Sequence, residues 1–309
     1  MVLVNYIVMC LIFGTTFLAI KVGVDAGAPP FFSAGIRFFL AGLILFAFMV
    51  WKKQARVSLL LRKEMLLTGL CLTFGTFATL YWAEQHISSG IAAVLSATAP
   101  LLVMLLQTRL SRQKLSAISW AGCLAGLAGV TLLLLPGLTF SFSVLWIAGC
   151  IAVLVGQLFY SAGAVYSRRV SQQFKDVSPI TLNAAQMMYG GVLLLVISAF
   201  TEQVHTEFLF SSQAVFSLLY LIFVGSMMGH SIFYWLVAKT NPLFPSTWLY
   251  ISPLIALTLG AVLYQEPLHL SSLAGGLAII AGIVMINLNA LKQLVSKKAP
   301  LEHAESPTK

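Results

Sequence analysis

Uninterrupted apolar stretches of about 20 residues recur along nearly the whole chain, and they restrict the possible folds more than any other feature. A helix of that length rises about 30 Å, the thickness of the hydrocarbon core of a bilayer. Only 9% of the residues are charged, whereas soluble domains carry roughly 25%, so a water-soluble fold is excluded. Lipid cannot satisfy free backbone groups, and the alternating pattern of a membrane barrel is absent. The stretches therefore predict transmembrane helices.

Ten spans are expected, joined by connections too short to hold a soluble domain. They are predicted at 2–23, 31–51, 63–83, 90–110, 115–136, 144–168, 178–199, 211–238, 244–265 and 270–291. The polar segment 292–309 follows as a tail. The fold class is thus an all-α integral membrane protein with the bilayer as its first partner.

The basic residues are partitioned between the two sets of connections. Of the 18 lysines and arginines, all except Lys21 and Arg37 fall in alternate connections, at the span ends that border them, or in the tail. The other connections carry only acidic charges, namely Asp25, Glu84, Glu202, Glu207 and Glu266. Because positive residues are retained in the cytoplasm, both termini are predicted to lie there, in a multi-pass protein of the cell membrane. This pattern also explains the net charge of +9 without nucleic acid.

The chain repeats itself. A shift of 153 residues aligns Tyr81-Trp82 with Tyr234-Trp235 and Pro100 with Pro253, and a shift of 149 aligns Pro30 with Pro179 and Arg37 with Gln186. Each half holds five spans, and an odd number reverses the insertion of the second copy. We therefore expect two inverted five-helix repeats, at 1–137 and 143–291, around a central site.

Several local motifs resemble one known family. They are Phe13-Gly14-Thr15-Thr16-Phe17 with Ala19-Ile20-Lys21, Pro30, Arg37-Phe38-Phe39-Leu40-Ala41, and in the second half Pro253, Gln265-Glu266-Pro267-Leu268, Gly275-Gly276 and Ala281-Gly282. On these residues the chain resembles the EamA-type transporters of the drug/metabolite transporter superfamily, up to about residue 289. The resemblance implies a ten-helix, two-repeat carrier, often an exporter of amino acids or related metabolites. Gln113 departs from it, because many first copies carry glutamate there.

The two matched prolines are the first candidates for a central cavity. Pro100 and Pro253 fall near the middle of their spans, where proline removes a helix hydrogen bond and frees the carbonyls of Ser96 and Leu249. Paired interrupted helices point to a midplane binding site. The alternative is a purely structural kink.

The repeated aromatic pairs admit two interpretations. Tyr81 and Trp82 end one span at the outer face, and Tyr234 and Trp235 end another at the inner face. Either they form interfacial belts, or they close the cavity at opposite faces and offer stacking or cation–π surface to a solute.

Charged and polar residues inside spans complete the candidates. Lys21 either snorkels to the outer surface or lines a vestibule, and Arg37 either pairs with Asp25 or Glu84 or attracts an anionic group such as a carboxylate. His230 is a candidate proton carrier, or a neutral histidine hydrogen-bonded between helices. The further cavity candidates are Asn183, Gln186, Tyr160, Gln157 and Thr16.

The leading hypothesis is a secondary transporter that moves a small amphipathic organic solute, for example an amino acid, by alternating access, with export expected from the resemblance. A channel or a non-transporting receptor is the alternative, and an intramembrane enzyme is disfavoured because the five histidines are scattered singly. The four cysteines form no CxxC or Cys/His grouping, so no metal is expected. No cofactor is expected either, and no phosphate loop is present. The oligomeric state is not predicted, and a monomer is compatible with the pattern.

Overall fold

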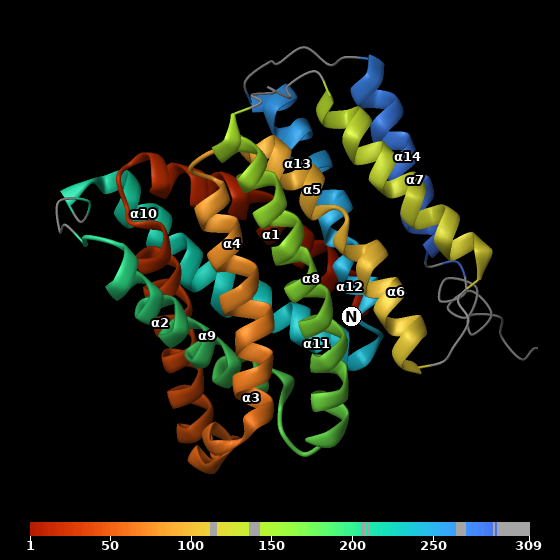
Figure 1. Cartoon of the computed structure of the whole chain (residues 1–309). Helices are drawn as coiled ribbons and strands as arrows, with labels where there is room; N and C mark the ends of the chain where they lie inside the picture. Colours follow the sequence, from red (N-terminus) through yellow and green to blue (C-terminus); the bar gives the residue numbers. More distant parts are fainter. Residues whose placement is uncertain are drawn as a thin grey trace, which may run out of the picture.

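The computed structural model describes residues 1–111, 116–135, 143–204, 208, 210–263, 270–286 and 288. Within them the regular structure is entirely helical (Figure 1). Eight of the described helical stretches are long and apolar enough to cross a membrane. The predicted all-helical membrane fold is confirmed. Gln113, Glu207, Glu266 and the tail 292–309 lie outside the described residues.

The helices follow the expected spans to within a few residues. In the first half they are α1 (Val2–Asp25), α2 (Pro30–Trp51), the 3-10 turn η1 (Val57–Leu61), α3 (Lys63–Thr68), η2 (Gly69–Gly75), α4 (Thr76–Ala83), α5 (Ser89–Ser96), α6 (Ala99–Ser111) and α7 (Ala117–Leu134). In the second half they are α8 (Val144–Gln173), α9 (Pro179–Thr201), α10 (Ser212–Tyr220), η5 (Leu221–His230), α11 (Ser231–Lys239), α12 (Leu243–Ser246), α13 (Trp248–Leu263) and α14 (Leu270–Ile286). α8 continues past its predicted end at 168 and reaches Gln173.

Two helices of the first half pack on their counterparts in the second half. The most extensive contacts in the described structure are those of α2 with α9 and of α7 with α14. Glycines make the second pair close: a Cβ at Gly275 would lie 2.5 Å from the carbonyl oxygen of Gly129. Small residues let membrane helices approach to backbone contact. α7 and α14 accordingly run side by side in Figure 1.

The first span of each half packs on helices of the other half. α1 packs on α10, η5, α11 and α13, which we call together the α1 group. α8 packs on η2, α4, α5 and α6, which we call the α8 group. The first span of each half thus packs on the third and fourth spans of the other half. This exchange is what a two-fold relation between the halves requires.

The prolines do not act as a matched pair of mid-helix kinks. The fourth span is interrupted at Ala97 and Thr98, so Pro100 stands in the first turn of α6. Proline is tolerated there because the first amides of a helix have no partner within the helix. In the second half the interruption is at Thr247, between α12 and α13, and Pro253 lies inside α13.

Two π-helical segments were not anticipated. η2 and η5 interrupt the third span of each half, and the shift of 153 residues superimposes them, since residue 69 corresponds to residue 222. π-helical turns are rare and accumulate at functional positions. Their recurrence makes them a feature of the repeat.

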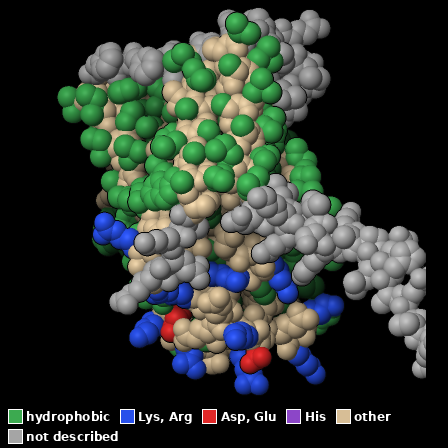
Figure 2. Space-filling view, turned by 90° about the vertical axis from the view of Figure 1, so that its right-hand side faces the viewer, with side chains coloured by type: hydrophobic (Ala, Val, Ile, Leu, Met, Phe, Trp, Pro, Cys, Tyr) green, Lys and Arg blue, Asp and Glu red, His purple; other side chains and the backbone are tan. Residues whose placement is uncertain are grey.

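The two ends of the molecule differ in charge. Figure 2 shows lysine and arginine side chains gathered at one end, below a broad apolar surface. Lys53, Arg56 and Arg62 line a hollow at this basic end together with Phe174 and Asp176. The connection after α2 and the connection after α8 therefore lie on the same side.

Candidate functional site

A central cavity lies between the α1 group and the α8 group. It is lined from α1, η5, α11 and α13 on one side and from η2, α4, α5 and α8 on the other, with one residue of α2. Among the residues predicted from the sequence, those that line it are Thr16, Arg37, Ser96, Gln157, Tyr160, His230 and Leu249. The cavity thus lies at the junction of the two helix groups.

Aromatic rings form much of the cavity wall. Phe13 lies 4.6 Å from Trp248 and 5.1 Å from His230, measured between ring centroids. Phe38 and Phe77 also present their rings to His230, at 5.4 and 5.6 Å. The structure gives the imidazole no hydrogen bond with the residues that it describes, so the predicted interhelical bond is not seen here. The wall is suited to stacking on an apolar or aromatic group.

Arg37 supplies the positive charge of the cavity. Its side chain is 1% exposed. Nε donates to Ser226 Oγ at 2.8 Å, and Nη1 donates to the hydroxyl of Tyr81 at 3.2 Å. The guanidinium carbon also lies 4.6 Å from the ring centroid of Phe38. No carboxylate of the described residues lies within ion-pairing distance of Arg37, so the predicted pairing with Asp25 or Glu84 is not made.

Neutral polar groups line the same cavity. Gln157 Nε2 donates to Ser96 Oγ at 3.1 Å, which joins α8 to the end of α5. The hydroxyl of Tyr160 accepts from Trp248 Nε1 at 3.2 Å and donates to Ser246 Oγ at 3.4 Å. These bonds join the α8 group to the interrupted ninth span, and they fix the indole that packs on Phe13.

Asn183 and Gln186 lie outside the cavity lining. Thr73 Oγ1 donates to Gln186 Oε1 at 2.8 Å, and Gln186 Nε2 donates to Asn183 Oδ1 at 3.0 Å. Asn183 Nδ2 then reaches Ser231 Oγ at 3.3 Å. This buried chain ties α9 to η2 and α11, and it provides the partners that polar groups need inside a membrane protein.

The aromatic pairs and the prolines are also absent from the cavity lining. Tyr81 contributes indirectly, through its bond to Arg37. Trp82 packs on His86 with centroids 4.9 Å apart, and Trp235 is half-buried. Tyr234 is buried beside Phe233. Pro100 and Pro253 line none of the described pocket either.

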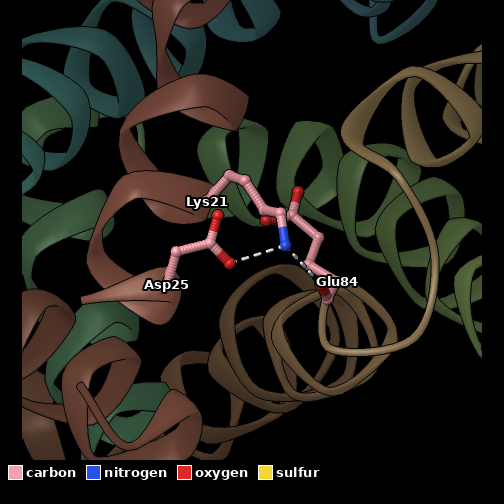
Figure 3. Close-up of polar contacts among 3 residues, drawn as sticks. All are labelled: Lys21, Asp25 and Glu84. Carbon is pink, nitrogen blue, oxygen red and sulfur yellow. Dashed lines mark hydrogen bonds and ion pairs between the residues drawn. The ribbon is translucent and has the colours of Figure 1, made fainter. Parts of the chain in front are cut away.

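Next to Ile20, which lines the cavity, Lys21 reaches from α1 to Asp25 and to the end of α4 (Figure 3). Its Nζ donates to Asp25 Oδ1 at 2.7 Å and to the main-chain oxygen of Glu84 at 3.5 Å. Glu84 is 0% exposed, and neither of its carboxylate oxygens has a hydrogen-bond partner among the described residues. Cations favour the carbonyls at a helix C-terminus, so Lys21 links α1 to the end of α4.

The other half repeats this bridge at the basic end. Arg168, near the end of α8, donates through Nη1 to the main-chain oxygens of Val237, at 2.9 Å, and of Ala238. Val237 is the counterpart of Glu84 under the shift of 153 residues. A cation of one helix group thus meets a helix C-terminus of the other group at each end. No group of three His, Cys, Asp or Glu residues suited to a metal ion occurs in the described part of the chain.

The chain has clear relatives. A family model described as the EamA-like transporter family matches residues 1–135 and 147–288. The uncharacterized inner membrane transporter YedA of Escherichia coli (strain K12) is 30% identical over 280 residues, covering 90% of this chain and 88% of the relative. The uncharacterized transporter YoaV of Bacillus subtilis (strain 168) is 29% identical over 288 residues, covering 92% of this chain and 96% of the relative. A crystal structure with a TM-score of 0.73 and 20% identity covers 93% of this chain and 98% of its own, and it shares the fold.

Proposed function

Because the chain belongs to the EamA-like transporter family, we propose that it is a secondary carrier for a small amphipathic organic carboxylate, such as an amino acid. The proposed mechanism is alternating access, with export as the direction. The observation that carries the proposal is Arg37: a buried guanidinium in an aromatic cavity, with no carboxylate partner among the described residues.

The chemistry of the cavity supports this solute class. In the Arg37 guanidinium, Nε donates to Ser226 and Nη1 donates to Tyr81, which leaves Nη2 to donate to a ligand. An anionic oxygen is the acceptor that completes such a group most favourably. The rings of Phe13, Phe77 and Trp248 suit the apolar part of the same molecule. A multiply charged nucleotide would find one cation and few further donors.

The two helix groups support the proposal of alternating access. The cavity separates the α1 group from the α8 group, and each end carries one cation-to-carbonyl bridge between the groups. Release of the Lys21 bridge would open one end, and release of the Arg168 bridge the other. The inversion of the halves makes the two movements equivalent, as in other carriers with inverted repeats.

We further propose the cell membrane as the location, with the basic end and both termini in the cytoplasm. Positive residues are retained on that side, and Figure 2 shows them at one end only of the face in view. The Escherichia coli relative bears the name of an inner membrane transporter. The repeats are assigned to 1–137 and 143–291, followed by the polar tail 292–309.

The test begins with binding. Purified protein is heated with a panel of amino acids and with their decarboxylated amines, and a ligand of the folded state must raise the apparent melting temperature. Carboxylates should stabilise the protein and the amines should not. The best ligand is then assayed in proteoliposomes for counterflow, which a carrier performs and a channel does not. Stabilisation by the amines alone would remove the proposed role of Arg37, and flux without counterflow would favour the channel.

A further inference from the structure

Glu84 combines features that a purely structural carboxylate does not need. It follows the span Lys63–Ala83 directly, it is fully buried, and neither carboxylate oxygen has a hydrogen-bond partner among the described residues. The ammonium of Lys21 is close enough to reach its main-chain oxygen, yet it is bonded to Asp25. An ionised carboxylate so placed would be costly, whereas a neutral carboxyl is tolerated. The geometry thus fits a protonated Glu84.

The surroundings define which charges act on this group. α1 contributes Lys21 and Asp25, and α4 itself contributes the phenol of Tyr81. α2 packs on α4 and brings Arg37, which is bonded to that phenol. The other charged and titratable neighbours lie in the turn and on α8. They are His86, whose ring meets that of Trp82 edge-on, and Cys150, next to the glycine at 149 that packs on Ala83 and His86.

Among the described residues, Lys21 is the cation placed to change partners. Its side chain is 32% exposed and that of Asp25 is 58% exposed, so water can replace Lys21 at Asp25 with little loss. Glu84 has no such access to water. When its carboxyl loses the proton, pairing with Lys21 offsets the cost of a buried charge, and the new ion pair joins α1 to α4. In the neutral form only the 3.5 Å contact with the main-chain oxygen remains.

We propose that Glu84 is a proton-binding site that selects the partner of Lys21 and thereby sets the strength of one gate. With Glu84 neutral, Lys21 stays with Asp25 on its own helix, and the α1 and α8 groups are held weakly at this end. With Glu84 ionised, Lys21 bridges the two groups and the end is locked. The gating role depends on the proposed carrier function, whereas proton binding does not.

Among the residues that the structure describes, the other end of the molecule has no equivalent switch. There the counterpart of Glu84 is Val237, and Arg168 meets only main-chain oxygens. In the proposed orientation Glu84 lies at the outer end of the protein, away from the cytoplasm. External acid would therefore loosen the outer gate and leave the inner gate unchanged.

Proton binding is tested by stability. Burial raises the pKa of Glu84 to about 8 from an ordinary 4.5, with Lys21 opposing and Asp25 adding to the rise. The neutral form then contributes its full stability below the unfolded-state pKa, and this contribution is lost as the pH rises through the folded-state value. Glu84→Gln keeps the neutral shape. Its advantage in melting temperature over the wild type should grow between about pH 5 and about pH 9.

Gate opening is tested by labelling in nanodiscs. Ile20→Cys places a thiol in the cavity lining beside Lys21, and protein without this change gives the background of the four native cysteines. The rate with a hydrophilic maleimide is compared between the wild-type and Glu84→Gln backgrounds at each pH, which cancels the titration of the thiol. The labelling rate in the wild-type background divided by that in the Glu84→Gln background should be near one in acid. This ratio should fall several-fold in alkali, where the wild-type gate is locked. Lys21→Met should hold it near one throughout.

The matched control is Glu64→Gln. Glu64 lies at the opposite end of the same span, and Gln173 donates to its carboxylate at 3.2 Å. This change should leave both pH profiles as in the wild type. A melting-temperature difference for Glu84→Gln that is constant with pH would overturn the proton site, and a labelling ratio that stays constant would overturn the gate. Neither measurement uses a solute, so a failure of counterflow with both pH effects intact would count against the carrier alone.

Discussion

Arg37 donates from Nε to Ser226 Oγ at 2.8 Å, and this bond joins the cation of α2 to the π-helical segment η5. The inverted counterpart is the bond between Thr73 of η2 and Gln186 of α9, also 2.8 Å long. The second span of each half thus binds the π-helical segment of the other half through one hydroxyl group, that of Ser226 or of Thr73. Only the Arg37 member carries charge and lines the cavity. The repeat supplies the scaffold, and a single difference supplies the candidate binding group.

Replacing Arg37 with glutamine, as the other half has, should preserve the fold and remove most carboxylate binding. Hydrogen bonds to charged groups are worth about 1.5–3 kcal/mol, so the affinity should fall roughly 10- to 100-fold. Arg37→Lys should recover part of it, because a lysine keeps the charge without the fork. Ligand-induced shifts in melting temperature measure the effect. Arg169→Gln, at an exposed site on α8, is the control.

His230 should not carry the pH response. Its ring lies among Phe13, Phe38 and Phe77, which offer edges and faces but no hydrogen-bond acceptor for an imidazole N–H. We expect His230→Phe to keep the pH profile of cavity labelling set by Glu84. If that profile became flat, the alternative role of His230 as proton carrier would regain support.

Glu202 should stabilise the start of α2. Its two carboxylate oxygens accept from the main-chain amides of Phe31 and Phe32 at 2.8 and 2.9 Å. A carboxylate on the first amides of a helix satisfies orphan donors and the helix dipole. Glu202→Ala should cost about 1–2 kcal/mol, seen as a lower melting temperature. Gln203→Ala, at the exposed neighbour, should change nothing.

The contact between α7 and α14 should be sensitive to one glycine and tolerant of the next. A Cβ on Gly275 would meet the backbone of Gly129 and Leu133 at 2.5 Å, whereas one on Gly276 would meet the end of the Leu254 side chain at 3.1 Å. Gly275→Val should therefore cost about 1–3 kcal/mol or more. Gly276→Ala should be tolerated. Melting curves of the two purified variants measure this difference. Equal losses of melting temperature in both variants would contradict the packing described.

The proposed orientation has a direct test in intact cells. Val57 and Lys175 are exposed at the basic end, and Gln85 is exposed at the other. A maleimide that does not cross membranes should label Gln85→Cys from outside, and it should label Val57→Cys and Lys175→Cys only after permeabilisation. If positions 57 and 175 were labelled from different sides, the inverted arrangement would be wrong.

The spans and the repeat could be predicted because length, hydropathy and the positions of Lys and Arg act locally along the chain. The direction in which a helix faces could not. Residues that face lipid and residues that face the core are both apolar here, so nothing marked Phe13, Phe77, Phe233 or Trp248 as members of the cavity wall. These residues were missed for that reason.

Other features arise only from tertiary contacts. The breaks at Ala97 and at Thr247 do not coincide with Pro100 and Pro253, since proline also fits a first turn. The pairing of Arg168 with Val237 depends on the exchange of helices between halves, which no local pattern reveals. Glu84 could have been noticed as a carboxylate at the end of an apolar span, but its burial could not.

The pairing of α2 with α9 and of α7 with α14 means that each of these surfaces meets its own copy. A polypeptide with five helices and such surfaces could form a dimer with a second copy of opposite orientation, provided that the cell inserted it into the membrane in both orientations. When the two copies are joined in one chain, a single copy no longer has to insert into the membrane in both orientations. Each copy is then free to drift, and an arginine can appear once, on one wall, without a second facing it.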